Sequence, residues 1–410
     1  MDKSAQDHAY AIAKDSDGNV YVAGYGAGMG TGNDYITIKY DSAGNQLWVQ
    51  RYNGPGNGDD VVYGIAVDSA GNVYVTGSSY GIGTGADLAT IKYNGQTGAP
   101  MWDLSNQPGT ISTQQGTPTS VNGKSIAARY NGPGNLGDGA RNIGLDSAGN
   151  VYVTGTSQGV LGNLDFATIK YNGQTGAPMW KGNPGIDANG AARYDGPGHG
   201  DDTPFCGYGT VFNRGIPVDS YGNVYVTGMS RGIGTNYDYA TIKYDVNGAP
   251  CWNFGPRPGT GEVEVAARYD GSGGPGDEMP LDIALDSENN VYVTGFSYGS
   301  ETNNDFATIK YDNNGNQLWV HRYNGLGNGS DIAYGIATDS AGNVYVTGVS
   351  LGSGTDYDYA TIKYSSSGEA LWNLADQAGV PAGANSIAAR YNGPGNGFDS
   401  AYDITAVQIS

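Results

Sequence analysis

The stretch DSAGNVYVTG at residues 68–77 decides the fold, because this 410-residue chain contains it six times with light changes. The other copies begin at residues 15, 146, 219, 286 and 339, so successive copies start 53, 78, 73, 67 and 53 positions apart. Each copy is a turn of Gly, Asn and Asp followed by a run of β-branched and aromatic residues. This combination predicts a tight turn that leads into a β-strand.

Each copy lies in a longer unit that contains four such runs. A run such as GIAVD (64–68) comes before it, and runs such as DYATIKY (238–244) and ARYNG (128–132) come after it. Four runs separated by Gly/Asn/Asp turns predict one four-stranded antiparallel sheet per unit. The segments Ile-Ala-Val and Ala-Thr-Ile place apolar side chains on both faces, so each sheet needs a neighbour on either side.

Radial packing buries both faces of such sheets and leaves only short edges. The sequence therefore predicts an all-β fold, a β-propeller with six four-stranded antiparallel blades in a single domain over residues 1–410, and a right-handed solenoid is the alternative. Pro217 would lie in the innermost, edge strand of the fourth blade. The predicted repeats are approximately 8–60, 61–138, 139–202, 203–278, 279–331 and 332–399.

These repeats resemble the bacterial and archaeal SBBP repeat family, which is named for a seven-bladed β-propeller. The resemblance rests on GIAVDSAGNVYVTG (64–77), DYITIKYDSAGNQLW (34–48) and the link RYNGPGNGDD (51–60), and it extends over nearly the whole chain. This chain departs from the family name by having six units. The resemblance implies a secreted or cell-surface protein and brings no catalytic residue with it.

A surplus strand is predicted at residues 400–410. Tyr402 and Ile404 match the first strand of a further unit, but Val407 stands where the turn-starting Asp should be. This strand can close the ring in the first blade, join an outer or partial sheet, or pair with a neighbouring molecule. In the last case head-to-tail contacts would give a filament. The residues of this self-association would be Tyr402, Ile404, Val407 and Ile409.

Charged residues recur at fixed positions of all six units. A cation at the same place in every sheet is best explained as a paired structural contact between neighbouring blades, not as six active sites. The six tryptophans also follow the repeat, which predicts that their indoles cover the rim of each sheet. The recurring charges are Lys39, Lys92, Lys170, Lys243, Lys310 and Lys363; Arg51, Arg129, Arg193, Arg268, Arg322 and Arg390; and Asp34, Asp87, Asp165, Asp238, Asp305 and Asp358.

The links between units gather Asn and Asp oxygens among glycines, as in YNGPGNGDD (52–60) and YDGPGHGDD (194–202). Calcium prefers six to eight oxygen ligands, so the links are candidates for Ca²⁺, although turns between blades have the same composition. The calcium candidates are Asn57, Asp59, Asp60, Asp201 and Asp202. The two cysteines, Cys206 and Cys251, either form a disulfide near the fourth unit or leave Cys251 as a small buried side chain.

Composition excludes several function classes. The formal net charge is −20 with no basic stripe, which argues against nucleic acid and anionic membranes as partners, and no apolar run is long enough for insertion into a membrane. The three histidines are far apart, and no known catalytic motif occurs. We therefore expect no enzymatic activity and no cofactor other than a calcium ion.

The repeat is interrupted by insertions at 103–128, 181–192, 253–267 and 373–389, with an extra segment near 203–212. Insertions in a rigid β scaffold are where binding specificity usually lies. The sequence predicts an extracellular or cell-surface scaffold that binds a protein, a glycan or copies of itself. The alternatives are a filament subunit joined by its terminal strand and, with less support, a polysaccharide-active enzyme.

Overall fold

The repeated turn forms because its Asp holds the backbone in place. In the second unit, Asp68 Oδ1 accepts hydrogen bonds from the backbone N–H groups of Ala70 (3.0 Å) and Asn72 (2.8 Å), and Oδ2 accepts one from the Tyr74 hydroxyl (3.0 Å). Gly71 has φ +79°, a conformation that a residue without Cβ adopts without strain. The turn therefore joins two antiparallel strands, as the sequence predicts.

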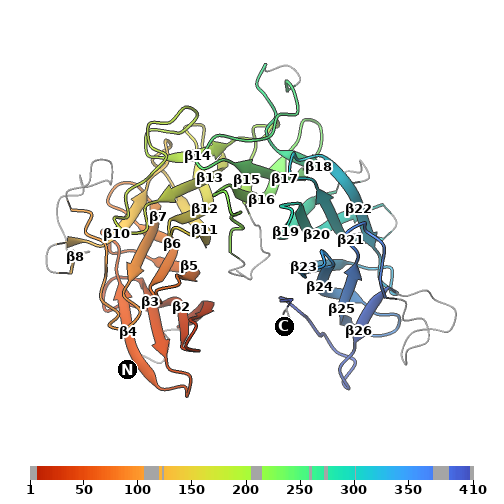
Figure 1. The fold of residues 1–410 in the computed structure, drawn as a ribbon, viewed down its shortest axis with the longest axis horizontal. Helices are drawn as coiled ribbons and strands as arrows, with labels where there is room; N and C mark the ends of the chain where they lie inside the picture. Colours follow the sequence, from red (N-terminus) through yellow and green to blue (C-terminus); the bar gives the residue numbers. More distant parts are fainter. Residues whose placement is uncertain are drawn as a thin grey trace. The chain divides into compact units, whose positions relative to one another are not determined.

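The computed structural model describes residues 7–105, 120–121, 124–204, 215–257, 261–271, 276–300, 302–372 and 387–406. These residues form six four-stranded sheets and one two-stranded ribbon (Figure 1), which confirms the predicted all-β fold. In chain order the sheets are β1 (His8–Lys14), β2 (Val20–Ala27), β3 (Asn33–Tyr40), β4 (Gln46–Tyr52); β5 (Asp60–Val67), β6 (Val73–Tyr80), β7 (Ala86–Tyr93), β10 (Ala127–Tyr130); β11 (Asp138–Leu145), β12 (Val151–Gln158), β13 (Leu164–Tyr171), β14 (Ala191–Tyr194); β15 (Asp202–Pro204), β16 (Val224–Arg231), β17 (Tyr237–Tyr244), β18 (Ala267–Tyr269); β19 (Glu278–Leu285), β20 (Val291–Gly299), β21 (Asn303–Tyr311), β22 (Gln317–Tyr323); and β23 (Asp331–Thr338), β24 (Val344–Leu351), β25 (Tyr357–Tyr364), β26 (Ala388–Tyr391).

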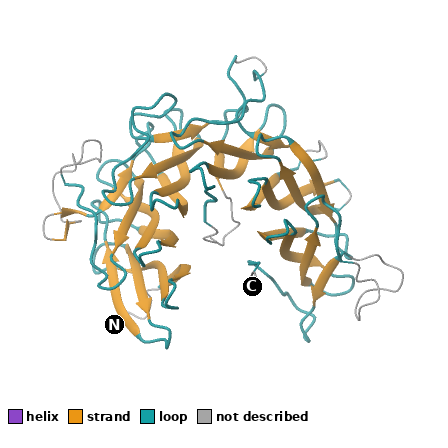
Figure 2. Cartoon of the chain, in the orientation of Figure 1, coloured by secondary structure: helices purple, strands orange, loops and turns teal. Residues whose placement is uncertain are grey.

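Strands and loops are the elements of the described chain (Figure 2). The ribbon of β8 (Ser120–Val121) and β9 (Lys124–Ser125) belongs to the insertion of the second unit. No helix that could cross a membrane is found among the described residues.

A β-bulge at the same place in the first strand explains the last glycine of the repeated stretch. The pairing between β5 and β6 shifts between Val62 and Gly64, and Gly77 lies opposite this shift. A Cβ atom on Gly77 would lie 2.0 Å from the backbone oxygen of Val61, so only glycine fits. The bulge recurs in the first, third, fifth and sixth sheets, and each time a glycine stands opposite. The bulge adds Tyr63 as an extra residue, so Tyr63 does not follow the regular alternation of side chains between the two faces of the sheet.

The hydrophobic core lies between successive sheets. One cluster combines Tyr21 and Trp48 of the first sheet with Ile65, Val75 and Ile91 of the second sheet, all at most 9% exposed. Equivalent clusters join the second sheet to the third and the fifth sheet to the sixth. The apolar residues are therefore buried where one of these sheets faces the next, as the sequence requires.

The chain divides into two compact units, one of Met1–Tyr225 with Tyr244–Ala249 and one of Val226–Lys243 with Pro250–Ser410.

The fourth sheet differs from its prediction. Its first strand is β15, which precedes the extra segment, whereas Pro217 lies outside the strands and accepts a hydrogen bond from Tyr225 through its carbonyl oxygen (3.1 Å). The strand expected around Pro217 is reduced to a single bridge between Val218 and Val224, which follows β15 along the same edge of the sheet.

Candidate functional site

The repeated lysines and tryptophans have a structural role. Lys39 Nζ and Trp48 Nε1 both donate to the backbone oxygen of Gly95, in the turn that follows β7 of the second sheet, at 2.8 and 3.1 Å. Lys92 and Trp102 make the same pair of contacts with the third sheet, at 2.8 and 3.2 Å. The prediction of structural contacts between neighbouring sheets is confirmed for these lysines. Four of the six indoles are in the core instead of covering a rim, since Trp48, Trp102, Trp180 and Trp252 are at most 9% exposed, whereas Trp319 and Trp372 are partly exposed.

The repeated arginine joins three strands of its own sheet and reaches the sheet before it. Arg129 Nη2 donates to Asp87 Oδ2 (2.6 Å) and to the backbone oxygen of Ser79 (2.8 Å), and Nη1 donates to Ser79 Oγ (2.6 Å) and to the Tyr52 hydroxyl (3.0 Å). Both members of the ion pair are buried. This pairing of each Arg with the Asp of the third strand was not foreseen in the sequence, which only placed both at fixed positions.

A buried carboxylate begins the first strand of most sheets. Asp60 accepts hydrogen bonds from the backbone N–H groups of Gly54 (2.5 Å) and Tyr80 (2.9 Å) and has no exposed surface. Burial raises the pKa of Asp60 to about 6, and it does the same for Asp138 and Asp331. We use the term junction for four groups: the Arg and Asp of one sheet, the link residue after the Arg-Tyr pair, and the first carboxylate of the next sheet.

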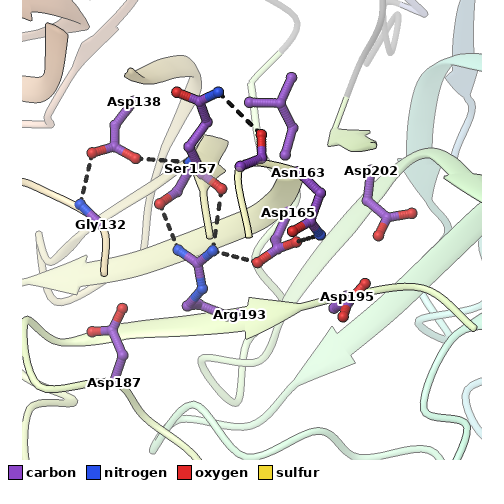
Figure 3. A network of polar contacts seen from close by, with 12 residues as sticks. Gly132, Asp138, Ser157, Asn163, Asp165, Asp187, Arg193, Asp195 and Asp202 are labelled. Atoms are coloured by element: carbon purple, nitrogen blue, oxygen red, sulfur yellow. Dashed lines mark hydrogen bonds and ion pairs between the residues drawn. The ribbon is translucent and has the colours of Figure 1, made fainter. Parts of the chain in front are cut away.

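The third junction brings three carboxylates together (Figure 3). Ligand oxygens of Asp165, Asp195 and Asp202 all lie within 4.8 Å of one another. Arg193 donates to Asp165 Oδ2, and Asn163 donates to Asp165 Oδ1 at 2.7 Å. Burial, followed by the charges of neighbouring acids such as Asp195, raises the pKa of Asp165 despite the adjacent guanidinium.

The fourth junction repeats this arrangement with different residues. Oxygens of Asp238, Asp270 and Glu278 lie within 4.8 Å of one another, with Asp238 and Glu278 buried and Asp270 exposed. Arg268 Nη2 donates to Asp238 Oδ2 at 2.6 Å. Burial, with the charges of Asp270 and Asp238, raises the pKa of Glu278 to about 7. Such groups are ligands that hard cations prefer.

One link position creates both clusters. It holds an Asn in four junctions and an Asp in the third and fourth, so RYNG becomes RYDG at 193–196 and 268–271. The sequence shows this difference between Asn and Asp. Its consequence could not be predicted, because only the fold shows that the link residue lies beside two buried carboxylates. The Asn positions are Asn53, Asn131, Asn324 and Asn392.

The sixth sheet exposes the face that other sheets bury under their successor. Tyr359 is 37% exposed and Tyr391 is 56% exposed. In the first sheet the equivalent residues, Tyr35 and Tyr52, are 1% and 3% exposed. Tyr35 shows what this face binds, because its hydroxyl donates to the backbone oxygen of Ala89 in the next sheet (3.3 Å). We call Tyr359, Lys363, Trp372 and Tyr391 the terminal face.

The surplus segment follows the sixth sheet as predicted. Within residues 400–406 the structure shows no ladder with any sheet. The ring of Tyr402 lies 5.0 Å from that of Tyr334 in β23, and Tyr334 occupies the bulge. Tyr10 and Tyr63, bulge residues of the first two sheets, meet in the same way at 5.6 Å. Tyr402 therefore occupies the position, relative to the sixth sheet, that a residue in the first strand of a following sheet would occupy. Val407 and Ile409 lie outside the described residues.

The predicted calcium residues are separated by the structure. Asp202 belongs to the third-junction cluster. Asp59 Oδ1 accepts a hydrogen bond from Asn33 N (2.9 Å), and Asp201 Oδ1 accepts one from Leu164 N (2.9 Å), so both tie a link to a strand. Asp60 is the buried first carboxylate described above, and Asn57, with φ +53°, shapes its link.

The predicted disulfide stays a prediction, because Cys206 lies outside the described residues. Cys251 is exposed rather than buried, which corrects the alternative that it is a small core residue. Much of two insertions, at 106–119 and 373–386, also lies outside the described chain.

The comparisons with known proteins bear on fold and family. The model of the SBBP β-propeller repeat matches residues 47–83, 135–162 and 319–354. No curated protein matches the chain. A polysaccharide lyase of family PL25, an ulvan lyase, is 13% identical with a TM-score of 0.43, covering 87% of this chain and 80% of its own. A putative 6-phosphogluconolactonase from Bacteroides uniformis is 10% identical, with a TM-score of 0.41 and coverages of 88% and 82%.

A putative oxidoreductase (glucose dehydrogenase) from Thermus is 14% identical with a TM-score of 0.37, covering 84% of this chain and 93% of its own. These similar structures correct one prediction. The expectation that the chain is not an enzyme is wrong as drawn, because solved structures similar to it include enzymes. The lack of familiar catalytic motifs in the sequence does not exclude catalysis on this fold.

Proposed function

Because the chain belongs to the SBBP β-propeller repeat family, we propose that it is an extracellular or cell-surface scaffold that binds through its terminal face. The observation that carries this proposal is the exposure of Tyr359 and Tyr391, whose equivalents in the other sheets are buried. Large exposed aromatic surfaces mark interaction sites. The repeat indicates what kind of partner fits the terminal face. In the preceding sheets the equivalent face packs against the next sheet, as the hydrogen bonds from Tyr35 to Ala89 and from Tyr239 to Ala307 show.

The partner that fits this face is the first sheet of a second copy. Ile12 in β1 is 68% exposed, whereas its equivalent Ile65 is 3% exposed because the preceding sheet covers it. The first sheet therefore exposes a residue that a preceding sheet would cover, and the sixth sheet exposes residues that a following sheet would cover. Packing the terminal face of one copy on the first sheet of another continues the contact already made between successive sheets, and this head-to-tail contact builds chains of copies.

Sedimentation velocity over a wide range of protein concentrations tests this proposal. Wild-type protein should associate. Tyr391→Asp or Ile12→Asp should abolish association, because burying a carboxylate in the apolar contact would remove its hydrating water at a large cost in free energy. Tyr221→Asp is the matched control, since Tyr221 is 76% exposed outside both faces. An equimolar mixture of the Tyr391→Asp and Ile12→Asp proteins should stop at dimers, because each retains one intact face.

Two results would count against the proposal. A monomer at all concentrations whose Tyr391 is protected from solvent would mean that one molecule covers its own face. Unchanged association of the Tyr391→Asp protein would place the contact elsewhere.

Strand addition by the terminal segment is a second candidate, favoured by the position of Tyr402 beside the bulge of the sixth sheet. A chain truncated before Tyr402 separates the two routes. Strand addition predicts that the truncated chain is monomeric, whereas packing of the terminal face predicts that it still associates.

A further inference from the structure

The fourth junction differs chemically from the fifth, although both have the same fold. In the fifth junction the carboxylates are Asp305 and Asp331, and the link residue is the neutral Asn324, whose neighbour Gly325 donates its N–H to Asp331. In the fourth, Asp238 and Glu278 stand beside Asp270. The exchange adds a negative charge next to two buried carboxylates, where repulsion is screened least.

One oxygen of this cluster is buried without a hydrogen bond. Asp238 Oδ2 accepts hydrogen bonds from Arg268 (2.6 Å) and Thr235 (3.3 Å). Asp238 Oδ1 has no hydrogen-bond partner in the described chain, although the side chain is only 5% exposed. A buried acceptor without a donor costs free energy and calls for a ligand that is not a protein group.

The charges at the site are unbalanced. Three carboxylates face one guanidinium, that of Arg268, so the cluster has an excess of negative charge when all its acids are ionised. Glu278 accepts hydrogen bonds from the Ser297 hydroxyl (3.2 Å, to Oε1) and from the backbone N–H of Tyr298. Asp270 is exposed and gives an ion a path from solvent. A cation placed among these oxygens would supply the missing charge and occupy Asp238 Oδ1.

We propose that Asp238, Asp270 and Glu278 bind a calcium ion. The ligand set consists of oxygen atoms alone, which selects hard cations over transition metals. Asp238 offers its unpaired oxygen, and water molecules from the exposed side at Asp270 complete the six to eight ligands that calcium takes. Magnesium demands a regular octahedron, which a site built from a link and two strands of different sheets is less suited to provide.

The same oxygen is unpaired in Asp87, Asp305 and Asp358, which makes those junctions internal references. Their link residue is an Asn, whose neutral oxygen is a weaker ligand than a carboxylate. The negative charge of Asp270 is therefore what distinguishes the calcium site from its homologous positions in the same chain.

Isothermal titration of the metal-free full-length protein with calcium chloride tests the proposal, with magnesium chloride as a second titration. Asp270→Asn should raise the calcium Kd at least tenfold, and Asp277→Asn, at a neighbouring exposed acid, should leave it unchanged. Asn324→Asp should add one calcium site by recreating the cluster at the fifth junction. The third-junction acids are present in every variant, so any calcium that they bind cancels in these comparisons.

Thermal unfolding controls for misfolding. In chelator, Asp270→Asn should melt at or above the wild-type temperature, because it removes a repulsion and restores the residue found in four other junctions. In calcium the order should reverse, since only the wild type gains stability from the bound ion. Absence of calcium binding to the wild type, an unchanged Kd in Asp270→Asn, or tighter binding of magnesium than of calcium would overturn the proposal.

Discussion

The ion pair between Arg129 and Asp87 allows the strongest test of how the junctions stabilise the fold. The side chains of Arg129 and Asp87 are 9% and 1% exposed, and Arg129 donates to four oxygens. Arg129→Met keeps most of the length of the side chain but removes all five N–H donors. It leaves Asp87 as a buried carboxylate without its guanidinium.

The expected cost is about 3–5 kcal/mol of unfolding free energy, the range for breaking a buried ion pair by removing one partner. The first sheet offers a matched control at the same repeat position. Arg51 pairs with Asp34 at 2.9 Å, but its side chain is 43% exposed. Water replaces a lost partner there, so Arg51→Met should cost at most about 1 kcal/mol.

Urea unfolding followed by tryptophan fluorescence measures both variants, and the comparison is direct because both arginines belong to the same compact unit. Adding Asp87→Asn to Arg129→Met should recover part of the loss, because most of the cost is the charge left behind. Equal losses for Arg51→Met and Arg129→Met, or no recovery in the double variant, would refute the reasoning that burial sets the strength of each junction.

Two further predictions concern pH and the bulge. In the folded state, burial raises the pKa of Glu278 to about 7 and the pKa values of Asp60, Asp138 and Asp331 to about 6, above their values in the unfolded chain. The protonated forms of these acids therefore favour folding at low pH, and this contribution to stability is lost as the pH rises from about 4 to about 7. Burial opposes the effect at Asp286, but hydrogen bonds from its turn lower its pKa, so its contribution is lost below about pH 4. The melting temperature should therefore peak near pH 4–5, and Asp138→Asn should flatten the decline above that pH; a melting temperature that rises steadily to pH 7 would contradict this. Gly77→Ala should destabilise the protein by more than about 2 kcal/mol in urea unfolding, because its Cβ would lie 2.0 Å from a backbone oxygen, whereas Gly83→Ala, at φ +76° with open space, should cost about 1 kcal/mol; equal losses would exclude the bulge as the cause.

The sequence predicted what depends on local chemistry. Turns such as the one at Asp68 are specified within a few residues, because the Asp, Gly and Asn that make them contact one another. The number of sheets followed from counting these turns. The sequence also shows that two links have Asp where the other four have Asn, but it does not show that this Asp joins a cluster of carboxylates.

The sequence by itself determined six four-stranded sheets, their apolar faces and the positions of the repeated charges, because period and turn chemistry act over short distances. Only the tertiary structure decided which charges meet. Arg129 pairs with Asp87 from a distance of 42 residues, and Asp238, Asp270 and Glu278 come from two strands and a link of neighbouring sheets. Contacts of this kind arise from packing one sheet on the next, and spacing along the chain does not encode which groups that packing buries together.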